Sequence, residues 1–264
     1  MGKTLSIGIT GGNGVLGKIL QTQLRNKAFY INCYNGDINS PDDLHTWVQS
    51  LMPDYMFHLA AIVPTIEVNK NPLSAYKTNV GGTISLLEQL VKLNKPVWLF
   101  VASSSHVYKS SDRPIRETDA LDPITIYGKT KLLAEQVCMD CMEKYNLKIC
   151  IGRIFSYYHQ TQKEPFLYPT ILKRLKEHKP GSPFYLQGAD SIRDFLTGED
   201  VADIMIKLLL SQAAGIYNIA SGTGIRIRDF VQKLYPEPLN IVPCGIPNFL
   251  VANVDKIRRE IYKI

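Results

Sequence analysis

Short apolar runs alternate with longer stretches of helical periodicity over the first 150 residues. Apolar and small residues at positions 5–9 predict a buried strand, and a helical pattern follows to residue 24. The further predicted strands are 30–34, 55–59, 97–102 and 148–151, and the further predicted helices are 41–51, 73–93 and 127–145. Strands that alternate with helices build parallel sheets, so this order predicts an α/β fold: a doubly wound parallel sheet with helices on both faces.

The pattern changes near Ser156, where segments shorten and proline, aromatic and basic residues become denser. Helices are predicted at 167–177 and 198–210, and a strand at 215–219. We therefore expect a main domain over residues 1–155 and a small lobe over residues 156–264, with some elements of the second segment returning to the sheet.

A glycine-rich turn at residues 10–17 joins the first predicted strand to the first helix. This order of elements places a helix N-terminus against a diphosphate. Gly11 would permit the tight turn, Gly14 would let the backbone approach phosphate, and Gly17 would let the helix pack closely on the strand. A tight turn that binds nothing is the alternative when the glycines are considered alone.

Tyr127 and Lys131 lie four residues apart, on one face of a predicted helix. A lysine charge there would lower the pKa of the phenol, which could then exchange protons near neutral pH. Serines 103–105 follow a predicted strand, at the edge where open α/β sheets bind ligands. Taken singly, such a pair and such serines also occur on surfaces and in loop caps, so the hypothesis depends on their combination with the glycine turn.

Composition narrows the class of protein. The net charge of +6 is spread along the chain without a basic stripe, so we expect no nucleic-acid partner. The excess suits an anionic small substrate, although ordinary solubility explains it equally well. No apolar run approaches the roughly 20 residues that span a bilayer, and no signal-peptide pattern opens the chain, so we expect no membrane association and a cytoplasmic location.

The five cysteines are odd in number and scattered, which predicts no disulfide framework. Cys138 and Cys141 form a C-x-x-C pair inside a helical pattern, without a second pair at metal-ligand spacing. We therefore expect helix cysteines and no metal.

Several motifs, in order, resemble those of the extended short-chain dehydrogenases/reductases of the NAD-dependent epimerase/dehydratase family, which modify nucleotide sugars. Besides the glycine turn and Tyr127-Gly128-x-x-Lys131, they are Asp37-Ile38, His58-Leu59-Ala60-Ala61, Asn79-Val80-x-Gly82-Thr83, Ser103-Ser104-x-x-Val107-Tyr108, Arg153-x-Phe155 and Arg193-Asp194-Phe195. The resemblance implies a Rossmann-like fold with a small C-terminal substrate-binding lobe.

The resemblance also implies roles for individual residues. Tyr127 would be the acid/base, Lys131 would hold the nicotinamide ribose and lower the Tyr127 pKa, and Ser104 would bond the reacting oxygen. The implied NAD(P)H-binding residues are Gly11, Asn13, Gly14, Val15, Leu16, Gly17, Asp37, Ile38, Leu59, Ala60, Ala61, Asn79, Ala102, Tyr127, Lys131 and Phe155. The implied substrate-binding residues are Ser104, Ser105, His106, Tyr127, Ser156 and Arg193. Further candidates for sugar or base contacts, with lobe packing as the alternative, are Tyr157, Tyr158, His159, Tyr168 and Tyr185.

Departures from the family pattern reduce the number of candidate activities. The short segment before Asp37 resembles the compact form of dTDP-4-dehydrorhamnose reductase and its relatives. Tyr34 and Asn35 stand where an acid would bind the adenosine ribose 2′-OH, so we favour NADP(H) over NAD, although no arginine stands there either. Ser105 and His106 replace the Asp-Glu pair of the dehydratases, and no cysteine of the 3,5-epimerising kind lies beside the serine.

These features predict an NAD(P)H-dependent reductase of a nucleotide-linked keto sugar, an NDP-4-keto-6-deoxyhexose, in deoxysugar and polysaccharide biosynthesis. An NDP-sugar 4-epimerase with tightly bound NAD is one alternative, and a non-catalytic NAD(P)-binding regulatory subunit is another. The family commonly dimerises through the Tyr/Lys helix and the long helix before it. The apolar content of residues 86–93 and 132–137 allows this, so we expect a homodimer.

Overall fold

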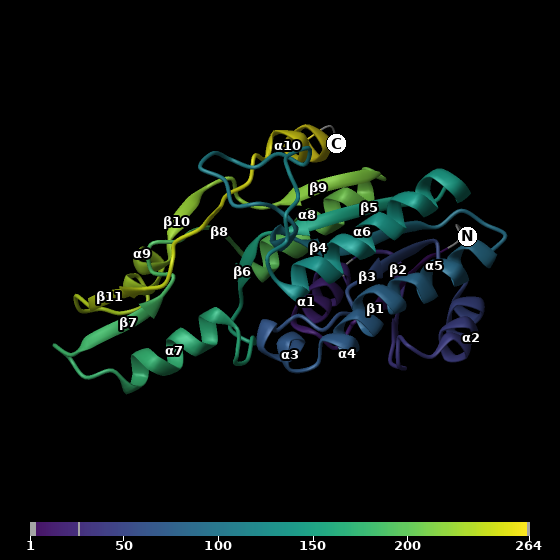
Figure 1. Ribbon diagram of the computed structural model, residues 1–264. Coiled ribbons are helices and arrows are strands. Elements are labelled where there is room, and N and C mark those ends of the chain that lie inside the picture. Colours follow the sequence, from purple (N-terminus) through teal and green to yellow (C-terminus); the bar gives the residue numbers. More distant parts are fainter. Residues whose placement is uncertain (1–3, 26, 263–264) are drawn as a thin grey trace.

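The computed structural model describes residues 4–25 and 27–262. Its centre is a six-stranded sheet in the order β2-β1-β3-β4-β5-β9 (Figure 1), and every pairing in it is parallel. The strands are β1 (Leu5–Thr10), β2 (Phe29–Tyr34), β3 (Tyr55–His58), β4 (Trp98–Ser104), β5 (Lys148–Ile154) and β9 (Gly215–Ile219). The strand order reverses between β1 and β3, which opens a crevice at the carboxyl ends of these strands. The predicted Rossmann-like fold is confirmed.

Helices cover both faces of the sheet because its strands are apolar on both sides. On one face the helices are α1 (Val15–Leu24), α8 (Gly198–Leu210) and α10 (Asp255–Ile261). On the other they are α2 (Pro41–Leu51), α5 (Gly82–Lys92) and α6 (Ile126–Tyr145). Ile9 and Phe100 join the first core and Met56 and Leu99 the second, all at most 1% exposed. The two cores together hold the sheet rigid beneath the crevice.

The long helix predicted over 73–93 is interrupted. It consists of α4 (Pro72–Tyr76), a π-helical turn η1 (Lys77–Gly81) and α5, and a short unpredicted helix, α3 (Thr65–Lys70), precedes it. The turn is centred on Asn79, whose amide Nδ2 donates to the Ile62 carbonyl while its Oδ1 accepts from the Ile62 N–H. Gly82 packs closely in this segment, because a Cβ there would meet Ile38, whereas Gly81 faces open space.

The second segment contributes to both parts of the molecule. Strand β9 pairs with β5, and α8 and α10 cover one face of the sheet, so all three lie with the main sheet. The remaining elements are β6 (Ser156–Tyr158), α7 (Leu167–Glu177), β7 (Pro183–Gln187), β8 (Ile192–Thr197), β10 (Gly224–Arg226), α9 (Ile227–Gln232), β11 (Asn240–Cys244) and β12 (Phe249–Leu250). A small sheet joins β6, β8, β10 and β12, and β7 pairs with β11. The division at residue 155 stays a prediction.

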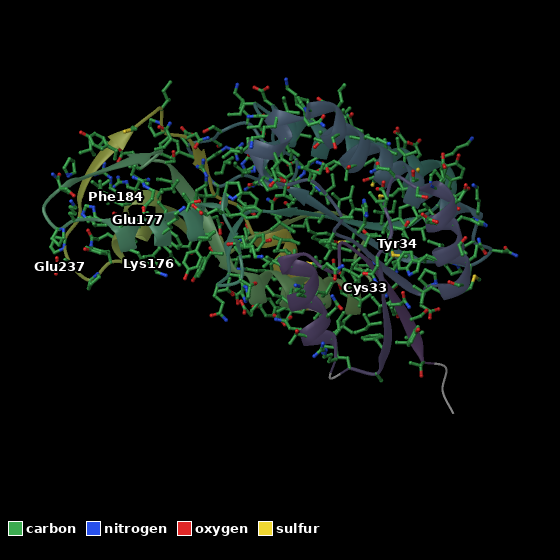
Figure 2. All side chains as sticks on the ribbon, turned by 90° about the horizontal axis from the view of Figure 1, so that it is seen from below. Cys33, Tyr34, Lys176, Glu177, Phe184 and Glu237 are labelled. Atoms are coloured by element: carbon green, nitrogen blue, oxygen red, sulfur yellow. The ribbon has the colours of Figure 1, made fainter. Side chains whose placement is uncertain are left out.

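The elements outside the main sheet project from one end of it. In Figure 1, α7, β7 and β11 lie at the left, and the parallel sheet lies at the right. Figure 2 shows Phe184 and Glu237 at this outer end, with Cys33 and Tyr34 of β2 at the opposite end. A separate apolar cluster that includes Ile171, Phe184 and Val231 supports the projection. Its position leaves the carboxyl edge of the sheet facing the projecting elements.

No helix within residues 4–25 and 27–262 is both long and apolar enough to cross a bilayer. All five cysteines are unpaired, and Cys138 and Cys141 lie on α6 as helix cysteines. Within the described part of the chain, no group of three His, Cys, Asp or Glu residues could hold a metal ion.

The variants Gly81→Ala and Gly82→Ala give a matched test of this packing. A methyl at Gly81 would meet nothing within 4 Å, so we expect the free energy of unfolding to rise by about 0.5–1 kcal/mol, since alanine is the better helix former. At Gly82 it would lie 2.9 Å from Ile38 side-chain carbons, and overpacking of about 1–3 kcal/mol should exceed that gain. Urea unfolding measures both, and equal effects would contradict the contact with Ile38.

Candidate functional site

A cavity of about 1360 Å³ opens at the carboxyl edge of the sheet. Most of the residues expected at the site line it: Gly11, Asn13, Gly14, Val15, Leu16, Gly17, Leu59, Ala60, Ala61, Ala102, Ser104, Ser105, His106, Tyr127, Lys131, Phe155 and Ser156. A smaller hollow of about 290 Å³ shares Gly11 and Asn13 and adds Asp37 and Ile38. Expected residues from five separated stretches of the sequence therefore meet around the larger cavity, and a sixth stretch borders the smaller hollow beside it.

The glycine turn forms one wall of this cavity. Gly11 has a φ of +74°, and a Cβ there would lie 2.6 Å from the Ala60 nitrogen, so only glycine fits without strain. A side chain at Gly17 would overlap the Gly11 carbonyl oxygen. Helix α1 begins after Gly14 with no side-chain cap and no acid in its first turn. By contrast, α8 is capped by Thr197 and Asp200.

An uncapped helix start leaves backbone N–H groups for an anion. Gly14, Val15 and Leu16, where α1 starts, all line the cavity. The residues present therefore fit the diphosphate of a dinucleotide cofactor, which the glycine turn predicted.

Tyr127 lies in the first turn of α6. The hydroxyl of Thr125 caps this helix by accepting from the Gly128 N–H at 3.0 Å. The Tyr127 side chain is 7% exposed, and burial raises its pKa well above the ordinary value, while a hydrogen bond with Ser104 opposes the rise. The Lys131 ammonium lies 5.9 Å from the ring centroid. Burial therefore dominates the pKa of Tyr127 in the free protein, and a lowering of that pKa by Lys131 stays a prediction.

Lys131 itself is held by the end of β4. Its ammonium donates to the Ala102 carbonyl at 2.9 Å. Burial lowers its pKa to about 8, and the carboxylate of Glu135, one turn later on α6, opposes this shift. Near neutral pH the amine is therefore charged, but it is close to losing its proton.

A buried ion pair lies behind these residues. Arg153 of β5 and Glu135 of α6 approach within 2.7 Å, with side chains at most 1% exposed. Glu135 also accepts from the Ser103 hydroxyl, and Ser103 stands opposite Arg153 in the β4–β5 register. Arg153 donates in addition to the Tyr108 hydroxyl at 2.9 Å. This network fixes α6 against the carboxyl ends of both strands.

Ser104 and His106 meet at the wall of the cavity. The Ser104 Oγ lies 3.0 Å from His106 Nδ1 and accepts the His106 backbone N–H at 3.2 Å. The imidazole packs edge-on against Tyr127, with ring centroids 5.7 Å apart. His106 is exposed where it lines the cavity, and desolvation by the surrounding protein, followed by the charge of Arg193, lowers the pKa of its imidazole to about 4. His106 is therefore neutral at physiological pH.

Two of the expected site residues are not among those that line either space. The Asn79 amide hydrogen-bonds to the Ile62 backbone and to the Thr130 hydroxyl. Asn79 therefore joins the loop at Ile62 to the helix that carries Thr130. The Arg193 guanidinium donates to the carbonyls of Ile192 and Asn248, both at 2.9 Å, and to the Asn248 side chain. Direct ligand contact by Asn79 or Arg193 stays a prediction.

The lobe side of the cavity is aromatic. Phe195 stacks on Phe230 with centroids 4.3 Å apart and planes 9° apart, and Tyr158 and Tyr168 pack beside them. Tyr157 and His159 also line the cavity, whereas Tyr185 is 59% exposed elsewhere. Sequence reasoning did not assign Phe195 and Phe230 to the site. Phe195 belongs to the Arg193 motif, which could have indicated it. Nothing in the sequence around Phe230 distinguishes it from an apolar core residue of a helix.

Comparison with known proteins places this geometry in a family. The family model described as GDP-mannose 4,6 dehydratase matches residues 16–238. The chain belongs to this family. The predicted membership among NAD-dependent epimerase/dehydratase enzymes of the extended short-chain dehydrogenase/reductase type is thereby confirmed, as is the predicted enzyme class.

Relatives of the chain differ in activity. The UDP-glucose 4-epimerase of Mycoplasma genitalium is 29% identical, in an alignment that covers 88% of this chain and 77% of the relative. The GDP-6-deoxy-D-mannose reductase of Pseudomonas aeruginosa is 28% identical over 238 residues, which cover 86% of this chain and 78% of the relative. The structure of RMD from P. aeruginosa complexed with NADPH superposes with a TM-score of 0.87 at 24% identity, over 98% of this chain and 93% of that chain.

The lowered pKa of Lys131 predicts a pH-dependent contribution to stability. An unfolded lysine has an ordinary pKa near 10.5 and a folded one here about 8. Between these values the unfolded chain binds more protons, so the free energy of unfolding should rise with pH relative to Lys131→Met, by up to about 1.4 kcal/mol per pH unit. Urea unfolding from pH 7.5 to 10 measures the difference.

The matched control is Lys129→Met, because Lys129 is exposed on the same helix. Its difference from wild type should stay constant across this pH window. If the Lys131→Met difference were equally constant, the lowered pKa would be wrong.

Proposed function

We propose that this protein is an NAD(P)H-dependent reductase of a nucleotide-linked keto sugar, an NDP-4-keto-6-deoxyhexose. The observation that carries the proposal is the convergence of Ser104, Tyr127 and Lys131 on one cavity whose wall is the uncapped start of α1. The reductase among the relatives supports the same substrate class.

The chain's own residues would divide the work as follows. A bound nicotinamide cofactor would supply the hydride. Tyr127 would give its phenolic proton to the carbonyl oxygen, and its raised pKa keeps that proton in place at neutral pH. Ser104 would donate a hydrogen bond to the same oxygen, stabilising the charge that develops there. The Lys131 ammonium, which points to the Ala102 carbonyl, would hold hydroxyls of the cofactor ribose.

We do not propose dehydration, because no carboxylate among the described residues hydrogen-bonds to Ser104, whose partner is His106. The acids that line the cavity are Glu67 and Glu199. A Glu199 carboxylate oxygen lies 3.0 Å from His159 Nε2. Elimination of water needs an acid and a base beside the reacting carbon, and Ser105 and His106 stand at those positions in the sequence.

A 4-epimerase is the second candidate, because the relatives include UDP-glucose 4-epimerases. The same Ser/Tyr/Lys set would suffice for the proton transfers of that reaction. NAD that copurifies and survives dialysis would favour it. A non-catalytic regulatory subunit is a third reading, and the retention of Tyr127 and Lys131 in the cavity argues against it.

For the cofactor we favour NADP(H). The smaller hollow is bordered by Tyr34 and Asn35 where an acid would exclude a 2′-phosphate. The Asn13 amide donates to the Asn35 side chain at 3.3 Å across it. Asp37, further along, already accepts from the Asn39 N–H.

We propose that the aromatic patch of Tyr158, Tyr168, Phe195 and Phe230 takes the nucleobase of the substrate by stacking.

The reaction is tested with the purified protein, NADPH or NADH, and a panel of NDP-4-keto-6-deoxyhexoses, by following nicotinamide absorbance. We expect oxidation of the cofactor with at least one sugar. Tyr127→Phe should lower kcat by about 10²–10⁴-fold, whereas Tyr145→Phe, which alters a 54% exposed ring at the other end of α6, should leave it unchanged. No turnover with any member of the panel would contradict the proposal.

We also propose a cytoplasmic homodimer that acts in deoxysugar and polysaccharide biosynthesis. Five unpaired thiols suit a reducing compartment. Ile84 of α5 and Leu133 of α6 are 38% and 42% exposed on neighbouring helices, which fits a face covered by a second copy.

The variant Leu133→Asp should shift the protein from dimer to monomer in light scattering at micromolar concentration, because a buried unpaired carboxylate is costly at an interface. Leu210→Asp is the control, since Leu210 is 49% exposed on α8, which covers the opposite face of the sheet. A wild-type monomer would refute the dimer.

A further inference from the structure

The hydroxyl of Ser104 has one proton and more than one neighbour that can take it. Its Oγ accepts the His106 backbone N–H at 3.2 Å and lies 3.0 Å from His106 Nδ1. A hydrogen bond with Ser104 also acts on the Tyr127 phenol. A serine hydroxyl donates once and accepts twice, so the protonation of His106 Nδ1 decides where the Ser104 proton points.

The two neutral forms of His106 have opposite consequences. If Nδ1 carries a lone pair, it takes the Ser104 proton, and Ser104 offers only lone pairs to a reacting oxygen. If Nδ1 carries the proton, it fills the second acceptor position of Ser104, and the hydroxyl proton is free for Tyr127 and the substrate. Only the second form makes Ser104 the donor that a carbonyl reduction requires.

The proposed reduction selects this second form, because a carbonyl oxygen only accepts hydrogen bonds and Ser104 must keep its own proton free to donate to it. The 3.0 Å contact between Ser104 Oγ and His106 Nδ1 then requires that Nδ1 carry the proton of the neutral ring.

We propose that His106 is a positioning residue that acts through Ser104: its Nδ1–H donates to Ser104 Oγ and directs the Ser104 proton toward Tyr127 and the reacting oxygen. The inference rests on the proposed reduction for its role, although the hydrogen bond itself exists in the free protein. His106 stays neutral throughout and transfers no proton. The Ser104 hydroxyl is thereby aligned before the substrate arrives.

The tautomer is measured directly by ¹⁵N NMR of histidine-labelled protein at neutral pH, without cofactor or substrate. We expect the signals of His106 to show a protonated Nδ1 and an unprotonated Nε2. Because the chain has five histidines, His106→Asn assigns them by loss of one set. The opposite tautomer would overturn the proposal whether or not the protein reduces any sugar.

Kinetics with a substrate that the wild type reduces test the role. His106→Leu should lower kcat about tenfold and change KM less, because the donor is lost in the transition state. His106→Asn should restore most of kcat, since its amide can place an N–H near the former Nδ1. In a Ser104→Ala background, His106→Leu should cause no further loss.

Additive losses in the double variant, or an Asn variant as slow as the Leu variant, would mean that His106 does not act through Ser104. A wild type without activity would count against the proposed reduction instead, and the tautomer would then be judged from the NMR spectrum alone.

Discussion

The buried ion pair between Glu135 and Arg153 is the constraint on which the site depends. One carboxylate joins the guanidinium of β5, the hydroxyl of Ser103 on β4 and the helix that carries Tyr127 and Lys131. The reacting groups therefore keep their spacing because α6 cannot slide along the sheet without breaking the pair. Loss of one partner would leave the other charge buried, at a cost of about 3–5 kcal/mol, and would loosen the place where Ser104 meets Tyr127.

The burial that makes this pair tight also sets the ionisation of the site. It raises the pKa of Tyr127 and lowers that of Lys131 and of His106. The free protein thus presents a protonated phenol and a neutral imidazole, which is the state a proton donor needs. A lysine four residues from a tyrosine predicts a lowered tyrosine pKa from charge alone, whereas in the folded chain the burial of Tyr127 raises its pKa.

Local signals made most of the fold predictable. Buried apolar runs between turn residues predicted every strand of the main sheet, and periodicity predicted α7 and α8 with their bounds. The glycine turn was predictable because its geometry is enforced within a few residues. The π turn at Asn79 was not, because its cause is a contact with Ile62, 17 residues away. The Phe195–Phe230 stack escaped for the same reason, since two elements far apart in sequence create it.

The hydrogen-bond partners of Arg153 and Arg193 determine whether the positive charge of each guanidinium is neutralised. Arg153 is neutralised by Glu135. Arg193 is held by the carbonyls of Ile192 and Asn248, which orient a guanidinium without cancelling its charge. Its neighbour Asp194 turns away and accepts from Ser221 and Gly222. Burial lowers the Arg193 pKa only to about 10, so the cation persists beside His106. A half-buried cation held by neutral acceptors is costly unless an anion joins it, which is the physical reason to expect a diphosphate nearby.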